Sequence, residues 1–172
     1  MNAISPNVKN TLVFAVLCVL GIRAQTVELQ ESLVIGDFVD VGDIEVAGDG
    51  SIFVSDVRGT EVAKFNRDGR LIKRSGGRGL GPGEFAGGPH HMALVNGGLL
   101  ISDLGGLAVH RFDADLNYIQ SLRPRAPMTI DAGPDGRIYM SIPDILSVQY
   151  VTKMAPDGTE LTQWSIDELS EH

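Results

Sequence analysis

The stretch that decides the fold is residues 44–75, IEVAGDGSIFVSDVRGTEVAKFNRDGRLIKRS, because the chain repeats its pattern. Residues 92–122, MALVNGGLLISDLGGLAVHRFDADLNYIQSL, form a second copy, and residues 128–165 form a looser third copy. The first two copies keep a separation of 47 residues between equivalent features: Asp49-Gly50 and Asn96-Gly97, Ser55-Asp56 and Ser102-Asp103, Phe65 and Phe112.

Each copy contains four short runs of β-forming residues, separated by Gly, Asn and Asp residues that suit tight hairpins. The runs Ile52-Phe53-Val54 and Leu99-Leu100-Ile101 are apolar without alternation, so both faces of these strands should be buried. Four strands in a period of about 40–47 residues are typical of a β-propeller. We therefore predict an all-β chain with about three four-stranded antiparallel blades, at residues 41–85, 88–126 and 127–165.

Residues 75–85, SGGRGLGPGEF, lie between the last strand of the first copy and the first strand of the second. A phosphate-binding loop would continue with Lys and Ser or Thr and open a helix, whereas here Glu84 and Phe85 precede another strand. We predict that this stretch connects two blades and that Phe85 packs between them.

The motifs GLGPGEF (79–85), Pro89, NGG (96–98) and LISD (100–103) together resemble the repeat of the NHL family of six-bladed propellers. The likeness covers residues 40–165 and is greatest to bacterial secreted propellers. It implies a domain from residue 26 to residue 172 that is the N-terminal portion, about half, of a six-bladed ring. We expect either an incomplete chain or a homodimer that closes one ring, with residues 26–36 as a closing strand.

The first 25 residues resemble a secretory signal peptide, with Lys9 ahead of the apolar run TLVFAVLCVLGI and Ala24 near the cleavage point. This predicts a secreted or periplasmic protein. A lipoprotein anchor at Cys18 is the rival interpretation, although Leu17 is unsuited to it. Cys18 is the only cysteine, so the mature chain would hold no disulfide.

The charge balance argues against nucleic acid or an anionic membrane as a partner. The full chain carries a net charge of −8, and removal of Lys9 and Arg23 with the signal peptide changes this to −10. Seven basic residues cluster in one region, where we expect them to face solvent: Arg58, Lys64, Arg67, Arg70, Lys73, Arg74 and Arg78.

The candidate ligand-binding residues are His90 and His91, at the start of an inner strand, and Arg78 in the connection before it. In a propeller this position lies at the mouth of the central channel. The surrounding sequence also resembles one blade of the peptidyl-hydroxyglycine amidating lyases, which implies zinc at His90. Zinc catalysis needs about three protein ligands. The other copies offer no histidine at this position, so we predict no cofactor, with zinc or calcium as the alternative.

Asp56 and Asp103 each end the second strand of a copy. They would either accept backbone N–H groups or act as calcium ligands or acids, and their repetition favours the structural role. We find no nucleophile–base pair in the sequence. The leading hypothesis is a binding module for a protein, peptide or carbohydrate, and the alternative is a metal-dependent enzyme of the lyase or lactonase type that uses the channel.

Overall fold

A computed structural model describes residues 33–95, 97–123, 129–143 and 149–165. The predicted signal peptide (1–25) and most of the predicted closing strand (26–36) lie outside the described residues. Of that strand the structure describes residues 33–36, which are in no strand.

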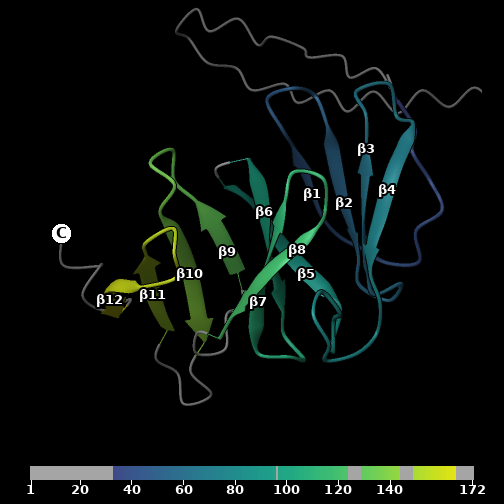
Figure 1. Cartoon of the computed structure of the whole chain (residues 1–172). Helices are drawn as coiled ribbons and strands as arrows, with labels where there is room; N and C mark the ends of the chain where they lie inside the picture. Colours follow the sequence, from purple (N-terminus) through teal and green to yellow (C-terminus); the bar gives the residue numbers. More distant parts are fainter. Residues whose placement is uncertain (1–32, 96, 124–128, 144–148, 166–172) are drawn as a thin grey trace, which may run out of the picture. The chain divides into compact units, whose positions relative to one another are not determined.

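The described residues form three four-stranded antiparallel sheets (Figure 1). Blade 1 consists of β1 (Val41–Val46), β2 (Ile52–Asp56), β3 (Glu61–Phe65) and β4 (Leu71–Gly76). Blade 2 consists of β5 (Pro89–Val95), β6 (Gly98–Asp103), β7 (Ala108–Asp113) and β8 (Tyr118–Leu122). Blade 3 consists of β9 (Thr129–Ala132), β10 (Ile138–Pro143), β11 (Gln149–Met154) and β12 (Glu160–Ser165). The predicted all-β fold with about three antiparallel blades is confirmed.

In each blade, strands that are consecutive in the chain pair with each other in antiparallel orientation. The predicted turn glycines have the left-handed conformation that lets the chain reverse within a few residues. The turn glycines and their φ angles are Gly50 at 84°, Gly69 at 77°, Gly97 at 78°, Gly136 at 74° and Gly158 at 93°.

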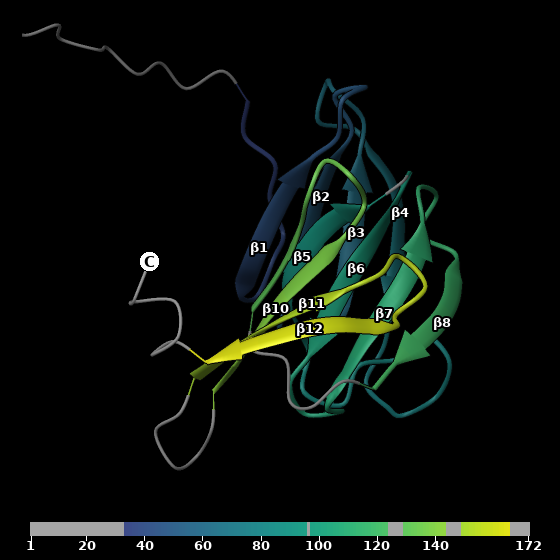
Figure 2. The ribbon, with the colours of Figure 1, turned by 90° about the vertical axis from the view of Figure 1, so that its left-hand side faces the viewer.

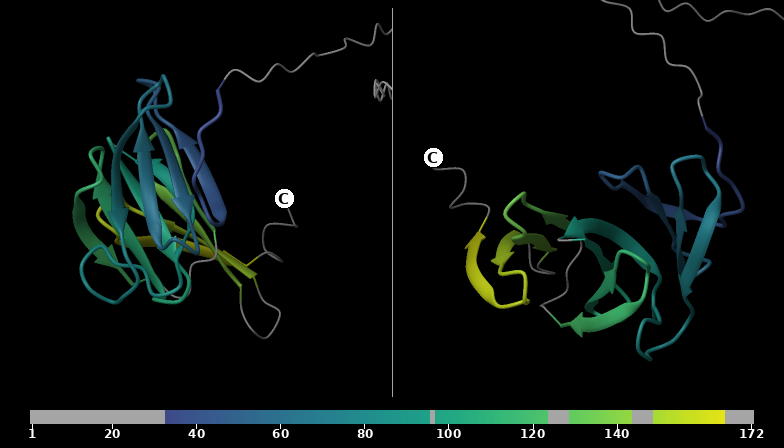
Figure 3. Two further views of the ribbon diagram at one scale, coloured as in Figure 1. Left: turned by 90° about the vertical axis from the view of Figure 1, so that its right-hand side faces the viewer. Right: turned by 45° about the horizontal axis from the view of Figure 1, so that its top comes forward.

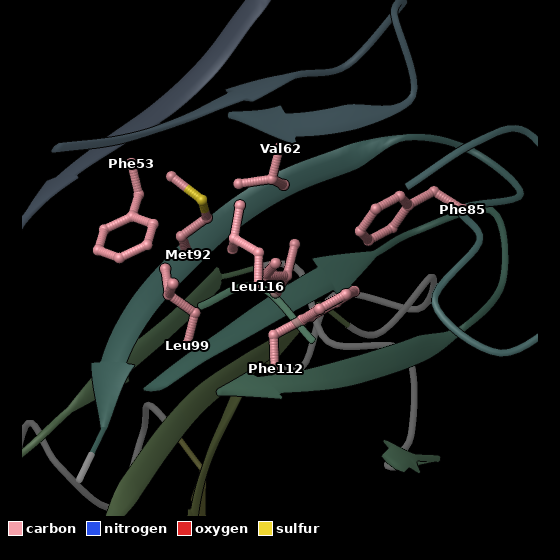
Figure 4. Close-up of a cluster of buried hydrophobic side chains, with 8 residues drawn as sticks. Phe53, Val62, Phe85, Met92, Leu99, Phe112 and Leu116 are labelled. Carbon is pink, nitrogen blue, oxygen red and sulfur yellow. The ribbon is translucent and has the colours of Figure 1, made fainter. Parts of the chain in front are cut away.

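The apolar strand β6 separates two hydrophobic cores. Leu99 and Ile101 belong to the cluster that packs blade 2 against blade 1, together with Phe53 and Phe112 (Figure 4). Leu100 points to the opposite face and joins the cluster that packs blade 2 against blade 3. All three β6 side chains are fully buried, which explains the apolar run without alternation.

The first strands of the blades, β1, β5 and β9, are the inner strands and contact one another in sequence order. Figures 2 and 3 show the three sheets from other sides. One hydrogen bond joins two inner strands directly, since the N–H of Met92 donates to Oδ2 of Asp43 at 2.8 Å. Blades 1 and 2 are therefore joined by a polar contact between their inner strands as well as by an apolar core.

The connection between β4 and β5 covers residues 77–88 and links two blades as predicted. Phe85 is fully buried in the core between blades 1 and 2. Its ring stacks on Phe112 with centroids 6.1 Å apart and meets His110 edge-on at 5.2 Å. Phe85 therefore fixes the end of the connection to β7 of the following blade.

The two faces of blade 1 are covered differently. On the face remote from blade 2, Ile35 and Phe38 pack over the core of β2 and β3. The inner strand β1 is not covered there, because Ile44 is 55% exposed and Val46 is 60% exposed. Met92, which has the register position of Ile44 in blade 2, is only 2% exposed. Among the described residues, the inner edge of blade 1 thus has no neighbour on this side, whereas β5 and β9 each pack against the preceding inner strand.

Candidate functional site

The inner strands of blades 1 and 2 begin with the same hydrogen bond, from an inner-strand N–H group to a serine on the second strand, which we call the serine frame. The N–H of Asp43 donates to Oγ of Ser55 at 2.8 Å, and the N–H of His91 donates to Oγ of Ser102 at 3.0 Å. Both serines are fully buried on the second strand of their blade, and both inner strands have a bulge at this point. The bulge gives Asp43 and His91 equivalent places despite their different side chains.

Blade 3 has a related frame. Oγ1 of Thr129 lies 2.6 Å from Oγ of Ser141, which has the register position of the buried serines in blades 1 and 2. The serine partner is therefore constant in the three blades, whereas the inner strands present Asp43, His91 and Thr129. A constant frame with varied polar side chains lets a propeller change its ligand without changing its fold.

An acidic cavity of about 480 Å³ lies beside these inner strands and is lined by Asp43, Glu45, Asp131 and Tyr139, among others. Glu45 and Asp131 have the same register position in blades 1 and 3. Burial raises the pKa of Glu45, and the negative charges of Asp43 and Asp131 raise it further. A positively charged ligand group would relieve this repulsion.

The predicted site residues lie on two different elements. His90 and His91 are half-buried on β5, and their side chains form no hydrogen bond or ion pair with the other described residues. Arg78 is exposed in the connection, where it forms a β-bridge with Phe85. Within the described residues no hydrogen bond or ion pair joins Arg78 to either histidine.

The close approach of the two inner strands leaves no room for a histidine at the equivalent of His90 in blade 1. Gly42 occupies this place, and a Cβ atom there would lie 2.8 Å from the carbonyl oxygen of His90 and 2.7 Å from Cγ2 of Val57. The equivalents in the third copy, residues 126–128, lie outside the described residues. Among the described residues, no group of three or more His, Cys, Asp or Glu side chains is arranged to hold a metal ion.

Asp56 and Asp103 hold loops to their blades through backbone hydrogen bonds, which agrees with the structural role favoured from the sequence. Asp56 is 2% exposed and Asp103 is 1% exposed. The N–H donors are Val39, Asp40 and Gly59 for Asp56, at 2.8–3.0 Å, and Ala86 and Gly87 for Asp103, at 2.7–2.8 Å. Most of these donors precede the blade in the chain, so each carboxylate fastens the incoming connection to the second strand.

Sequence reasoning missed two residues of the acidic cavity, Glu45 and Asp131. They lie 86 positions apart in the chain, and only the pairing of each inner strand with its neighbour shows that they are equivalent. The alternation of polar and apolar residues along β1 and β9 was the available signal.

The sequence matches no protein-family model, and the search of curated proteins found no match. Three solved structures are similar to this chain. The first is virginiamycin B lyase from Staphylococcus aureus, with a TM-score of 0.57 and 12% identity over 72% of this chain and 40% of that chain. The second is a streptogramin B lyase, with a TM-score of 0.57 and 15% identity over the same shares. The third is a protein of Bacteroides fragilis described as exported, with a TM-score of 0.59 and 18% identity over 80% of this chain and 40% of that chain.

These similarities show a β-propeller fold, and they do not single out the NHL family. The chain spans about 40% of the length of these three structures. Within the described part of the chain, no helix has the length and apolar character needed to cross a membrane.

Proposed function

We propose that this chain is part of an exported propeller of the NHL type that binds a ligand at the face formed by its inner strands. The observation that carries the proposal is the constant serine frame that presents different polar side chains, Asp43, His91 and Thr129. The proposed export is supported by the signal-like segment at residues 1–25 and by the similarity to a protein described as exported.

The charge of the face favours a ligand with a positive group. Glu45 and Asp131 share the cavity with Asp43, and burial, followed by the negative charges of Asp43 and Asp131, raises the pKa of Glu45. Tyr139 adds an aromatic ring to the same wall, and Nζ of Lys153 lies 5.9 Å from the centre of that ring. Carboxylates beside an aromatic ring suit an ammonium or guanidinium group. We therefore propose a protein or peptide segment with an exposed Lys or Arg as the ligand, rather than a neutral carbohydrate.

The proposed ring extends beyond the three blades. We propose that they are about half of a six-bladed ring and that another blade packs against Ile44 and Val46. Because Met92 and Ile130 are buried at the register position of Ile44, a complete ring would bury all three residues in the same way.

Binding of short peptides tests the function. We expect fluorescent peptides with one Lys or Arg to bind the exported protein more tightly than the same peptides with Gln or Glu. The double variant E45Q/D131N should weaken this binding at least tenfold, because it removes two of the three carboxylates while keeping their shapes. The control E160Q changes an exposed acid on β12 and should bind like the unmodified protein.

Equal binding of Lys, Gln and Glu peptides would contradict the proposed ligand class, as would E45Q/D131N binding at full strength. Tighter binding of neutral oligosaccharides than of any peptide would reassign the ligand to carbohydrate. One equivalent of zinc in the purified protein, lost in H90A, would instead support the enzyme alternative.

A further inference from the structure

A second cavity, of about 220 Å³, lies away from the inner strands on the outer half of blade 2. The β4–β5 connection covers it with residues 79–84, and β6, β7 and β8 supply its other walls. Its polar lining residues include Glu84, Asp103, His110, Tyr118, Ser121 and Arg123. The proposed ligand face uses none of these residues.

A chain of close polar contacts crosses this cavity. Oγ of Ser121 lies 2.8 Å from Nδ1 of His110, and the hydroxyl of Tyr118 lies 2.8 Å from the same Oγ. The other ring nitrogen, Nε2 of His110, lies 3.7 Å from Oδ2 of Asp103. This nitrogen is buried and has no hydrogen-bond partner among the described residues, and His110 as a whole is 5% exposed.

The neighbours of His110 favour one tautomer. The carboxylate of Asp103 can only accept, so a neutral ring is best placed with its proton on Nε2. Nδ1 is then an acceptor and receives the hydroxyl proton of Ser121. The oxygen of Ser121 in turn accepts from Tyr118. The contacts therefore present a serine hydroxyl hydrogen-bonded to a neutral imidazole, which is the arrangement of a nucleophile and its base.

The arrangement belongs to blade 2 alone among the three blades described. His110 pairs with Ser121 across β7 and β8. The equivalent pairs are Ala63 with Arg74 in blade 1 and Thr152 with Gln163 in blade 3. The pair in blade 3 is also hydrogen-bonded, from Nε2 of Gln163 to Oγ1 of Thr152 at 3.4 Å. Neither of these side chains is a base, so a serine paired with a histidine is found in blade 2 alone among the described blades.

We propose that Ser121 is a nucleophile activated by His110 and that this cavity accepts a small ester. Ser121 Oγ would attack the ester carbonyl carbon while its proton passes to Nδ1 of His110. The tetrahedral intermediate would then collapse, with the proton on Nδ1 passing to the departing alkoxide, which leaves as an alcohol. Water would hydrolyse the acylated Ser121, give one proton to Nδ1 and release a carboxylic acid, and Ser121 would recover its proton from Nδ1.

Two further features suit this chemistry. Burial lowers the pKa of His110, and the nearby Asp103 only partly opposes the shift, so the ring is a free base at neutral pH. Arg123 borders the same cavity and donates from Nη1 to the carbonyl oxygen of Gly106 at 3.3 Å. As a cation that lines the cavity, Arg123 would stabilise the oxyanion that the attack creates.

The test is covalent labelling of the full exported chain with a fluorophosphonate probe, with the modified residue located by mass spectrometry. We expect one label per chain, on Ser121, and slow release of p-nitrophenol from p-nitrophenyl acetate. S121A should lose both signals. H110Q should keep the melting temperature within a few degrees and slow labelling at least 100-fold, since general bases contribute at about this level. S75A, which changes a half-buried serine on β4, should label like the unmodified protein.

The charges of Asp103 and Arg123 act on the pKa of His110, and the titratable groups Glu84 and Tyr118 line the same cavity. If His110 is the base that activates Ser121, D103N should move the pH profile of labelling to lower pH, because the negative charge of Asp103 opposes the lowering of the His110 pKa. Absence of label on Ser121 in the folded protein would overturn the proposal, and so would unchanged labelling in H110Q. Failure of these tests would leave the peptide-binding proposal intact, because the two sites share no residue.

Discussion

Leu116 shows how a single residue is held in an unfavourable conformation by its burial. Its φ angle is 55°, and the equivalent turn positions in blades 1 and 3 are Gly69 and Gly158. The left-handed region costs a non-glycine residue about 1–2 kcal/mol. The Leu116 side chain is fully buried in the core between blades 1 and 2, beside Phe112 and Leu99 (Figure 4). Packing therefore outweighs the backbone cost at this position.

A pair of leucines tests this balance. Leu107 also has a positive φ, of 46°, but its side chain is 55% exposed. We expect L116G to lower the free energy of unfolding by about 3 kcal/mol, because the lost core packing exceeds the strain relieved. L107G should leave stability unchanged or raise it by about 1 kcal/mol. Urea unfolding followed by tryptophan fluorescence measures both, and a similar loss in the two variants would contradict this explanation.

At the scale of the element, the connection between blades depends on a buried carboxylate. Burial alone would raise the pKa of Asp56, but its hydrogen bonds from Val39, Gly59 and Asp40 and the charge of Arg74 together hold the pKa below 3.8. A carboxyl group with a lowered folded-state pKa stabilises the fold above its unfolded-state pKa. This contribution is lost as the pH falls through 3.8 towards the lower folded-state value.

This predicts a pH-dependent cost for D56N. Above about pH 5 the variant should be less stable by about 2 kcal/mol, since the buried N–H donors lose a charged acceptor. The difference between the two proteins should shrink below pH 3.8 as Asp56 becomes protonated in the unmodified chain. D157N, at an exposed turn, is the control and should show a smaller change. Denaturant unfolding at pH 3–7 measures the difference, and a constant difference over this range would contradict the role assigned to Asp56.

The elements were largely predictable from the sequence, because each depends on local chemistry that repeats. The sequence alone predicts the glycine turns, the apolar strands and the buried Phe85 at the end of the β4–β5 connection. The inner strands were harder to align. The β1–β2 and β5–β6 hairpins differ in length, and Val41 and Pro89 are 48 residues apart although Asp56 and Asp103, with which they pair, are 47 apart. This offset of one residue hides the equivalence of Asp43 and His91.

The candidate sites were less predictable than the fold because they join strands through tertiary contacts. Glu45 of blade 1 and Asp131 of blade 3 line the same cavity only because both blades pack against blade 2. Ser121 lies opposite His110 because of the register between β7 and β8. The spacing of the sequence repeats does not predict this register. The turn at Leu116 also lacks the glycine found at its equivalents. Its conformation is set by a core whose other members lie on β2, β3, β5, β6, β7 and the β4–β5 connection.

At the scale of the whole molecule, the uncovered inner edge of blade 1 is the feature that a ring would bury. Ile44 is exposed where blades 2 and 3 bury Met92 and Ile130, and Val46 is exposed where Leu94 and Ala132 are half-buried. Exposed apolar residues on an edge strand favour association with another strand or sheet. The chain is therefore expected to associate through this surface when no further blade covers it.

The most direct test that these blades are part of a ring is the mass of the protein in solution, measured by light scattering. We predict species of two or more chains at micromolar concentration, and a shift to the mass of a single chain in the double variant I44S/V46S. The control L80S removes a more exposed leucine, 78% exposed, from the β4–β5 connection and should leave the mass unchanged. A stable single-chain species in the unmodified protein would contradict the account, because the inner edge of blade 1 would then need no neighbour.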